Sequence, residues 1–198
     1  MRNRVCSPTR ADTTDALMVD LRMSEGGEPE MVAFLCSYLF DERTHLNDLY
    51  FPADDRTVEY WIASEVPRPA FGGTKLVWVL ISGTTTSAAE EFAYDLQQLR
   101  RAILIGEVTA GAANFDYRYR VTEHLMFSVP SGFPINPNSG QNWEGTGVQP
   151  DVVVGAAAAF DTSYVDALQH VIGLGGHGYR RSILDEAEQE MTSRSQRT

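Results

Sequence analysis

The chain has 198 residues, of which 43% are hydrophobic and 22% are charged, and these proportions are ordinary for a globular protein. A chain of this length can bury about 70% of the surface that it exposes when unfolded, which is enough for a sizeable core. Its formal net charge is −11, and it has no basic cluster larger than Arg180-Arg181. Nucleic acids and anionic membranes both bind positively charged surfaces, so we expect neither as a partner.

Cysteine and histidine usage excludes several further classes of site. Two cysteines do not make a disulfide framework, and Cys36 lies in an apolar helical pattern, where a small core residue is expected. The four histidines are scattered without metal-binding spacing, so we expect no metal and no cofactor. No apolar run reaches transmembrane length, and the start does not resemble a signal peptide. The compartment stays unknown: cytoplasmic by default, and secreted or periplasmic if the N-terminus is truncated.

The first predicted unit is a strand, a glycine loop and a helix. Residues 1–14 are polar and are expected to form a loose lead-in. Residues 16–19 read as a strand that leads into Asp20-Leu21-Arg22 and a loop with Gly26-Gly27. Two adjacent glycines permit a backbone turn that side chains would forbid, and they expose N–H groups. Pro29 suits the first turn of the helix that follows.

Two aromatic-rich runs come next, residues 47–51 and 57–62, and they predict a β-hairpin around Pro52. The stretch over residues 75–106 then reads as a buried strand, a helix and a second buried strand. Phe92, Leu96 and Leu99 give this helix its apolar face; the other faces carry Glu90, Glu91, Asp95 and Gln98. The unit predicts a right-handed crossover in a parallel sheet, and such sheets bind ligands beyond the carboxyl ends of their strands.

Ser87 lies at that location. With Glu90 it fits the S-x-x-E capping box that opens a helix. Its hydroxyl would lie at the positive end of the helix, beside free backbone N–H groups that could hold an oxyanion. A serine in this pattern is a helix N-cap more often than a nucleophile, so the pattern alone leaves both roles open.

The remaining chain alternates short elements with loops and ends in a charged segment. We expect one core domain over residues 15–172 and a C-terminal tail over 173–198 that is a frayed helix or disordered. The elements expected within these bounds are a small-residue loop at 109–113, paired strands at 117–121 and 125–129, an edge strand at 148–154 and a helix at 164–172.

Several segments in fixed order resemble one known family. The segments are residues 86–93, 105–111 and 143–151, together with Asp20-Leu21-Arg22 and Gly26-Gly27, which match a DLRxNxGG motif except that Ser24 replaces the usual asparagine. The chain resembles the tail-specific, or carboxy-terminal processing, serine protease family. That family includes the tricorn protease core and interphotoreceptor retinoid-binding protein, and the present chain is most similar to their branch.

The resemblance implies an α/β fold with a ClpP/crotonase-like core of repeated β-β-α units, here lacking the family's N-terminal helical part. It places the family's nucleophile on Ser87. It also implies an oxyanion hole formed by the backbone N–H groups of Ala88 and of the Gly26-Gly27 loop. Donors of this kind are each typically worth a factor of about 10² to 10³ in rate.

The general base is where the sequence departs from the family. The processing-protease branch has a lysine where this chain has Ala112, which excludes a Ser-Lys dyad. The tricorn-like branch uses an upstream histidine with a glutamate that matches Glu144, although spacing alone would make Glu144 an exposed loop carboxylate. No histidine lies in the matching upstream region. His45 and His124 remain as candidates, and each is more typical of a packed or surface histidine.

The resemblance therefore predicts a serine endopeptidase that hydrolyses peptide bonds through an acyl-enzyme on Ser87. Glu144 would support a histidine that is missing from this chain, so we expect a truncated or weakly active form. Its substrate would be a peptide or an unfolded protein, and a homo-oligomer is left open. The alternative is a non-catalytic retinoid-binding, lipid-binding or interaction domain of the same fold.

Overall fold

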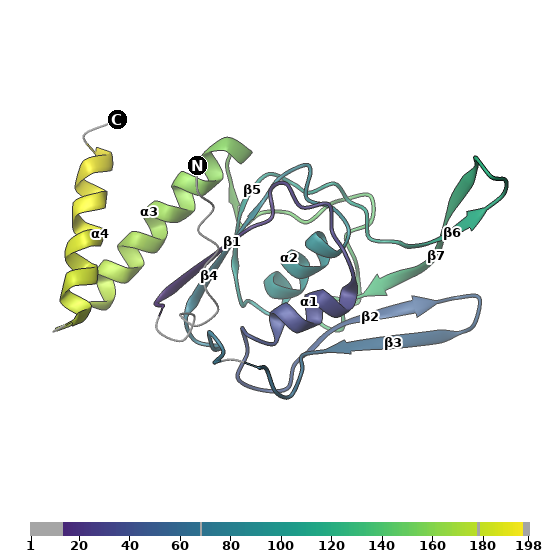
Figure 1. Ribbon diagram of the computed structural model, residues 1–198, viewed down its shortest axis with the longest axis horizontal. Helices are drawn as coiled ribbons and strands as arrows, with labels where there is room; N and C mark the ends of the chain where they lie inside the picture. Colours follow the sequence, from purple (N-terminus) through teal and green to yellow (C-terminus); the bar gives the residue numbers. More distant parts are fainter. Residues whose placement is uncertain (1–13, 68, 178, 196–198) are drawn as a thin grey trace.

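In the computed structural model, residues 14–67, 69–177 and 179–195 are described, and they form two four-stranded sheets with helices packed between and beside them (Figure 1). The lead-in expected over residues 1–14 lies outside the described residues except for Thr14. The α/β fold class inferred from the sequence is confirmed: a parallel sheet is combined with an antiparallel one.

The parallel sheet has the strand order β1 (Ala16–Asp20), β4 (Leu76–Ile81), β5 (Ile103–Gly106), β8 (Val152–Val153). The first three strands were predicted close to these bounds. The last is shorter than the expected strand over residues 148–154, because only residues 151–154 run along β5. Val148 bonds instead to Thr109, which lies beyond the end of β5, and Pro150 has no N–H to donate, so the backbone hydrogen bonds to β5 begin at Asp151.

The sheet is buried on both faces. Successive side chains of β4 point to opposite sides, and each side packs against other elements. Val77, Val79 and Ile81 pack with α1 (Pro29–Cys36) and α2 (Ala88–Gln98). Trp78 and Leu80 pack on the other side against α3 (Ala156–Leu174). The apolar residues of β4 are therefore core residues, as predicted, except for Leu76, which is exposed at the start of the strand. Cys36 of α1 is a core residue as well.

The antiparallel sheet has the order β3 (Arg56–Trp61), β2 (His45–Phe51), β7 (Met126–Ile135), β6 (Phe115–Arg120). Both predicted hairpins are confirmed. The second strand of the later hairpin, however, continues well past the predicted residue 129 and pairs with β2, with Asp48 opposite Ile135. Two hairpins that are far apart in the sequence thereby become one sheet. They extend from the same side of the molecule (Figure 1).

The C-terminal region is more helical than predicted. Helix α3 begins at Ala156 rather than at residue 164, because Gly155 takes the N-cap position and the alanine run that follows has high helix propensity. The tail forms α4 (Tyr179–Ser195), which packs against α3 and buries Leu184 and Ala187, so the alternative of a disordered tail is wrong over these residues. Among the described residues, no helix has both the length and the apolar character needed to cross a membrane.

The close approach of β4 and β5 at Gly106 gives a first prediction. Gly106 has φ +140°, and a Cβ atom built there would lie 1.9 Å from the carbonyl oxygen of Ile81. We expect Gly106→Ala to lower the free energy of unfolding by about 3 kcal/mol or more, since either the backbone or the sheet must shift. Urea denaturation of the purified chain measures this change.

Gly173→Ala is the matched control. Gly173 lies in α3, and an added Cβ would meet no atom within 4 Å. The same Gly-to-Ala exchange should there raise stability by about 0.5–1 kcal/mol. Equal urea midpoints for the two variants would contradict the predicted clash between the strands.

Candidate functional site

The loops that follow β1, β4 and β5 meet at one end of the parallel sheet. The Thr86 N–H donates to the carbonyl of Ser24 at 3.1 Å, which joins the first two loops. The Ala110 N–H donates to the carbonyl of Thr85 at 3.0 Å, which joins the second and third loops. Ser87 therefore lies at the carboxyl ends of the strands, where sites in parallel sheets occur.

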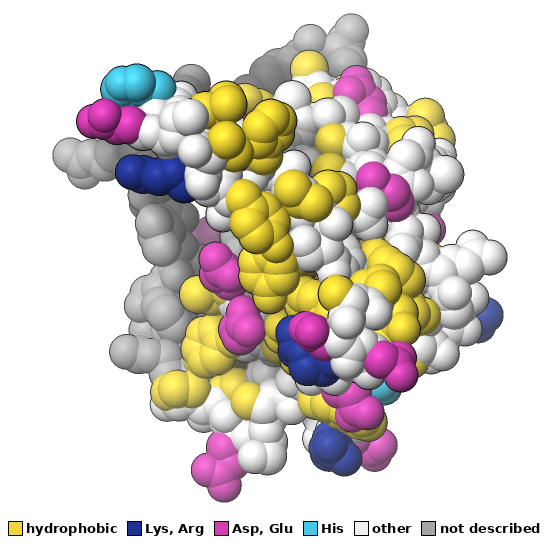
Figure 2. Space-filling view, turned by 90° about the vertical axis from the view of Figure 1, so that its right-hand side faces the viewer, with side chains coloured by type: hydrophobic (Ala, Val, Ile, Leu, Met, Phe, Trp, Pro, Cys, Tyr) yellow, Lys and Arg dark blue, Asp and Glu magenta, His cyan; other side chains and the backbone are white. Residues whose placement is uncertain are grey.

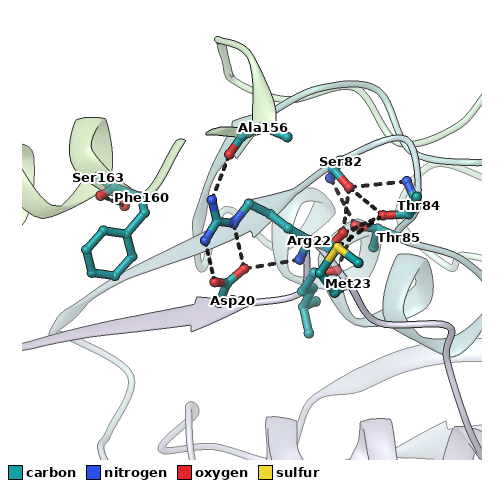
Figure 3. A network of polar contacts seen from close by, with 10 residues as sticks. Asp20, Arg22, Met23, Ser82, Thr84, Thr85, Ala156, Phe160 and Ser163 are labelled. Carbon is teal, nitrogen blue, oxygen red and sulfur yellow. Dashed lines mark hydrogen bonds and ion pairs between the residues drawn. The ribbon is translucent and has the colours of Figure 1, made fainter. Parts of the chain in front are cut away.

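A polar network fixes the first loop against the second (Figure 3). The hydroxyls of Ser82 and Thr84 donate to the carbonyl oxygen of Arg22 at 2.6 and 2.5 Å. The Arg22 guanidinium donates to both carboxylate oxygens of Asp20 at 2.9 and 2.7 Å, and to the carbonyl of Ala156 at 2.7 Å. These hydrogen bonds hold the pKa of Asp20 below its ordinary value. Asp20-Leu21-Arg22 thus serves as an anchor for the glycine loop that follows.

Ser87 is the N-cap residue of α2 and has an unusual backbone conformation, with φ 57° and ψ −128°. A non-glycine residue at positive φ typically costs about 1–3 kcal/mol and persists where its surroundings impose it. The predicted capping box is present at the start of α2, where the Ser87 N–H donates to Glu90 Oε2 at 2.9 Å. Ser87 is nevertheless an exposed residue, so it can be reached from solvent.

Glu90 is the fully buried carboxylate that holds Ser87 in place. Its Oε1 accepts hydrogen bonds from the Thr109 hydroxyl at 2.5 Å and from the Gly111 N–H at 2.7 Å. Its Oε2 accepts from the Ala112 N–H at 2.9 Å in addition to the Ser87 N–H. One side chain therefore joins the start of α2 to the whole loop after β5.

The glycine loop lies directly against Ser87. A Cβ atom at Gly26 would lie 2.7 Å from Ser87 Cβ and 3.0 Å from the Ala88 nitrogen, so only glycine fits there. Gly27 and Ala88 line the same pocket as Ser87. Neither of their N–H groups has a hydrogen-bond partner among the residues that the structure describes. The backbone groups predicted to hold an oxyanion are thus brought next to the serine.

The pocket beside Ser87 has a volume of about 460 Å³, which is within the usual range of about 300–1,000 Å³ for ligand sites. Residues of α1, α2 and the antiparallel sheet contribute to its walls, so it lies between the helices and the hairpins. Its lining combines apolar and acidic side chains, including Leu49, Trp143, Glu28, Glu91 and Asp116.

Glu144 lies at the edge of this pocket. Its carboxylate accepts hydrogen bonds from the N–H groups of Ala113 and Asn114 at 2.7 and 3.0 Å. Both of these residues line the pocket, as does the buried Trp143 that precedes Glu144. Glu144 itself is exposed and is not among the lining residues. The structure thus connects Glu144 to Ser87 through a shared wall and not through a direct contact.

None of the four histidines lines the pocket with Ser87. His45 bonds to Asp48 at 2.8 Å and stacks on Trp61, and His124 is exposed at the tip of the β6–β7 hairpin. His170 lies on α3, on the opposite face of the parallel sheet, and His177 follows that helix. The two candidates from the sequence are therefore a packed histidine and a surface histidine.

The carboxylates of α2 were not recognised as site residues from the sequence. Glu91 and Asp95 were assigned to faces of the helix away from the core, yet both are buried. Burial raises the pKa of Glu91 to about 7, helped by the nearby charge of Glu30 and opposed by a hydrogen bond from the Asn47 side chain. The pKa of Asp95 is also raised, by burial first and by Glu91 second. The sequence feature that could have indicated this burial is the set of alanines in α2, because small side chains allow a helix to pack closely on several sides.

Comparisons with known proteins place this arrangement in context. The chain matches the structure of a photosystem II D1 C-terminal processing protease with a TM-score of 0.59 at 20% identity, over 73% of this chain and 36% of that one. It matches mature CPAF in complex with lactacystin with a TM-score of 0.64 at 17% identity, over 82% and 44% of the two chains. It matches a putative S41 protease from Bacteroides fragilis with a TM-score of 0.62 at 20% identity, over 91% and 45%.

At these identities the structural matches establish the fold, and the chain spans less than half the length of each of these three proteins. The sequence model of peptidase family S41 matches residues 4–154, which is most of the chain. The geometry around Ser87 and the sequence motifs thus agree with one assignment, and the chain belongs to peptidase family S41.

Proposed function

We propose that this domain is a serine peptidase that forms an acyl-enzyme on Ser87. The observation that carries the proposal is the position of Ser87. It is exposed, it has a strained backbone conformation at the start of α2, and it lies beside the N–H groups of Gly27 and Ala88, which have no hydrogen-bond partner among the described residues. The hydroxyl oxygen would attack the carbonyl carbon of a peptide bond. The two N–H groups would then stabilise the oxyanion that develops. Collapse of this intermediate would break the peptide C–N bond, and the amine would leave with the proton removed from the Ser87 hydroxyl.

The proton of the Ser87 hydroxyl needs an acceptor, and this requirement limits the rate that we expect. No histidine lines the pocket, and one carboxylate oxygen of Glu144, Oε2, already accepts two backbone N–H groups. A positioned base typically contributes a factor of about 10² to 10⁴. The domain should therefore react slowly by itself and should respond to a small base supplied from solution.

The alternative of a retinoid-binding or lipid-binding domain is less consistent with the pocket. Glu28, Glu91 and Asp116 line the cavity beside Ser87, and an apolar ligand would desolvate these carboxylates without pairing them. A second, apolar pocket lies between α1 and α2 but holds only about 110 Å³. That volume is well below the range of about 300–1,000 Å³ typical of ligand sites.

The first test of the proposal is covalent labelling with a fluorophosphonate. The wild-type chain should be labelled slowly and Ser87→Ala should not be labelled, because Ser87 is the proposed nucleophile. Imidazole in the buffer should accelerate labelling of the wild type by about tenfold or more if a missing base limits the rate. Intact-protein mass spectrometry measures the labelled fraction against time.

Ser64→Ala, which changes an exposed serine in the loop after β3, is the matched control and should label as the wild type does. No labelling of the wild type, with or without imidazole, would overturn the proposed chemistry. Equal labelling of Ser87→Ala would assign the reaction to another residue.

The second test concerns Glu144, which we assign to positioning the wall of the pocket. Glu144→Ala removes the acceptor for Ala113 and Asn114 and should slow labelling of Ser87 by about fivefold to tenfold, the equivalent of about 1 kcal/mol. Glu144→Gln keeps a carbonyl oxygen that can accept both bonds and should stay within about twofold of the wild type. Labelling rates and thermal unfolding of both variants measure the effect. If Glu144→Gln were as slow as Glu144→Ala, the negative charge and not the hydrogen bonding would be the essential property.

A further inference from the structure

The pocket that contains Ser87 also contains a buried carboxylate one helical turn away. Ser87 is the N-cap of α2 and Glu91 is four residues further along, a rise of about 6 Å along the helix axis. Both side chains line the same cavity, although Glu91 is only 7% exposed. A substrate held at Ser87 would therefore place its neighbouring side chain within reach of Glu91. The four-carbon stem of a lysine suits this length.

Among the described residues, no cation forms an ion pair with Glu91. The titratable or polar side chains that interact with it are Glu30 and Cys36 of α1, Asn47 of β2, Tyr60 of β3 and Asp95 of α2. Arg118 is the basic residue among those lining the pocket, and it is exposed. Three lining carboxylates therefore face one guanidinium. None of the ion pairs found in the described part of the chain involves Glu91.

This environment favours a bound cation. Burial, together with the nearby charge of Glu30, raises the pKa of Glu91 to about 7, so near neutral pH the carboxylate is only partly ionised. Tyr60 donates its hydroxyl to Glu30 at 3.3 Å and stays protonated, since burial and the two glutamates raise its pKa to about 12. A buried carboxylate without a counter-charge is costly, and an ammonium or guanidinium group would offset that cost.

The remaining walls suit the apolar stem of a long basic side chain. Apolar residues line the cavity from α1, both hairpins and the loop before β8; they are Pro29, Leu49, Phe115, Pro134 and Trp143. Lysine and arginine commonly bury their methylene groups against such surfaces while their charged ends find a polar partner. On the side of the molecule that carries the hairpins, acidic side chains lie among the apolar ones (Figure 2).

We propose that Glu91 is a specificity-determining residue, which selects peptides with a lysine or arginine side chain beside the bond held at Ser87. This inference rests on the proposed peptidase function in one respect, namely that a peptide bond is held at Ser87. The recognition itself is a binding event, and it can be measured without catalysis.

The experiment uses Ser87→Ala as the binding protein and two peptide amides as probes, acetyl-Ala-Ala-Lys-amide and its norleucine counterpart, which has a similar stem without the charge. Calorimetric titration at pH 8 should give about tenfold or more tighter binding of the lysine peptide, as expected for a charge-assisted hydrogen bond. The preference should shrink as the pH falls below about 7, since Glu91 then becomes protonated. It should disappear in Ser87→Ala/Glu91→Gln.

Ser87→Ala/Glu123→Gln is the matched control, because Glu123 is exposed at the tip of the β6–β7 hairpin, and it should keep the full preference. Equal affinity for the two peptides at pH 8, or a preference that persists in the Glu91→Gln protein, would overturn the inference. If Glu91→Gln does not fold, the pH dependence decides in its place: a preference for lysine that does not change between pH 6 and pH 8 also overturns it.

A parallel labelling arm separates this inference from the proposed function. Wild-type protein is treated with lysine and norleucine diphenyl phosphonates, which report reaction at Ser87. Lysine preference in both arms supports the inference and the peptidase together. Lysine preference in the titration with no labelling by either phosphonate supports recognition by Glu91 and contradicts the peptidase chemistry. Labelling by both phosphonates at equal rates, with no preference in the titration, contradicts the inference and leaves the peptidase intact.

Discussion

The site depends on one buried carboxylate that is fully satisfied. Taking the charge of Glu90 out of water costs several kcal/mol, and the four hydrogen bonds that it accepts offset this cost. One donor is the N–H group of Ser87, the N-cap residue of α2, and the other three belong to the loop after β5. The carboxylate therefore fixes the distance between Ser87 and this loop. Ser87 can therefore keep a positive φ that an isolated chain would avoid. The hydrogen bonds of Glu90 thus stabilise the strained backbone conformation of Ser87.

Local patterns were sufficient for most of the fold. The apolar strands around α2 and both hairpins could be predicted from short stretches of sequence, because residues that are close in sequence there are also close in space. The extension of β7 to Ile135 was missed because it contains Pro130, Gly132 and Pro134, which weaken a strand pattern, and because its partner β2 is distant in sequence. The early start of α3 was missed for a different reason: a run of alanines has helix propensity without amphipathic periodicity.

The candidate site could be predicted where its residues are held by backbone geometry, and less well where they depend on tertiary packing. Ser87, Ala88 and the Gly26-Gly27 loop follow strands, and parallel strands bring such loops to one end. The inward position of Glu91 depends on α2 being covered by α1 and by the antiparallel sheet, which no periodicity within the helix reveals. A polar residue that appears to lie on the outer face of a helix becomes a pocket residue once a second sheet covers that face.

Glu91 and Asp95 both oppose folding, and Glu91 is the one of the two that lines the pocket beside Ser87. The pKa of Glu91 is about 7 in the folded chain and about 4.5 when unperturbed, so the folded state binds more protons between these two values. Stability therefore falls as the pH rises from about 4.5 to about 7, and above pH 7 the ionised carboxylate persists without a cation to pair with it among the described residues. Asp95 adds to the cost, because its Oδ2 atom finds no hydrogen-bond partner in the described part of the chain. Groups that oppose folding in this way are concentrated at functional sites. A cation bound at Glu91 would lower its pKa and recover part of the lost stability, so the same carboxylate is costly in the empty pocket and favourable in the occupied one.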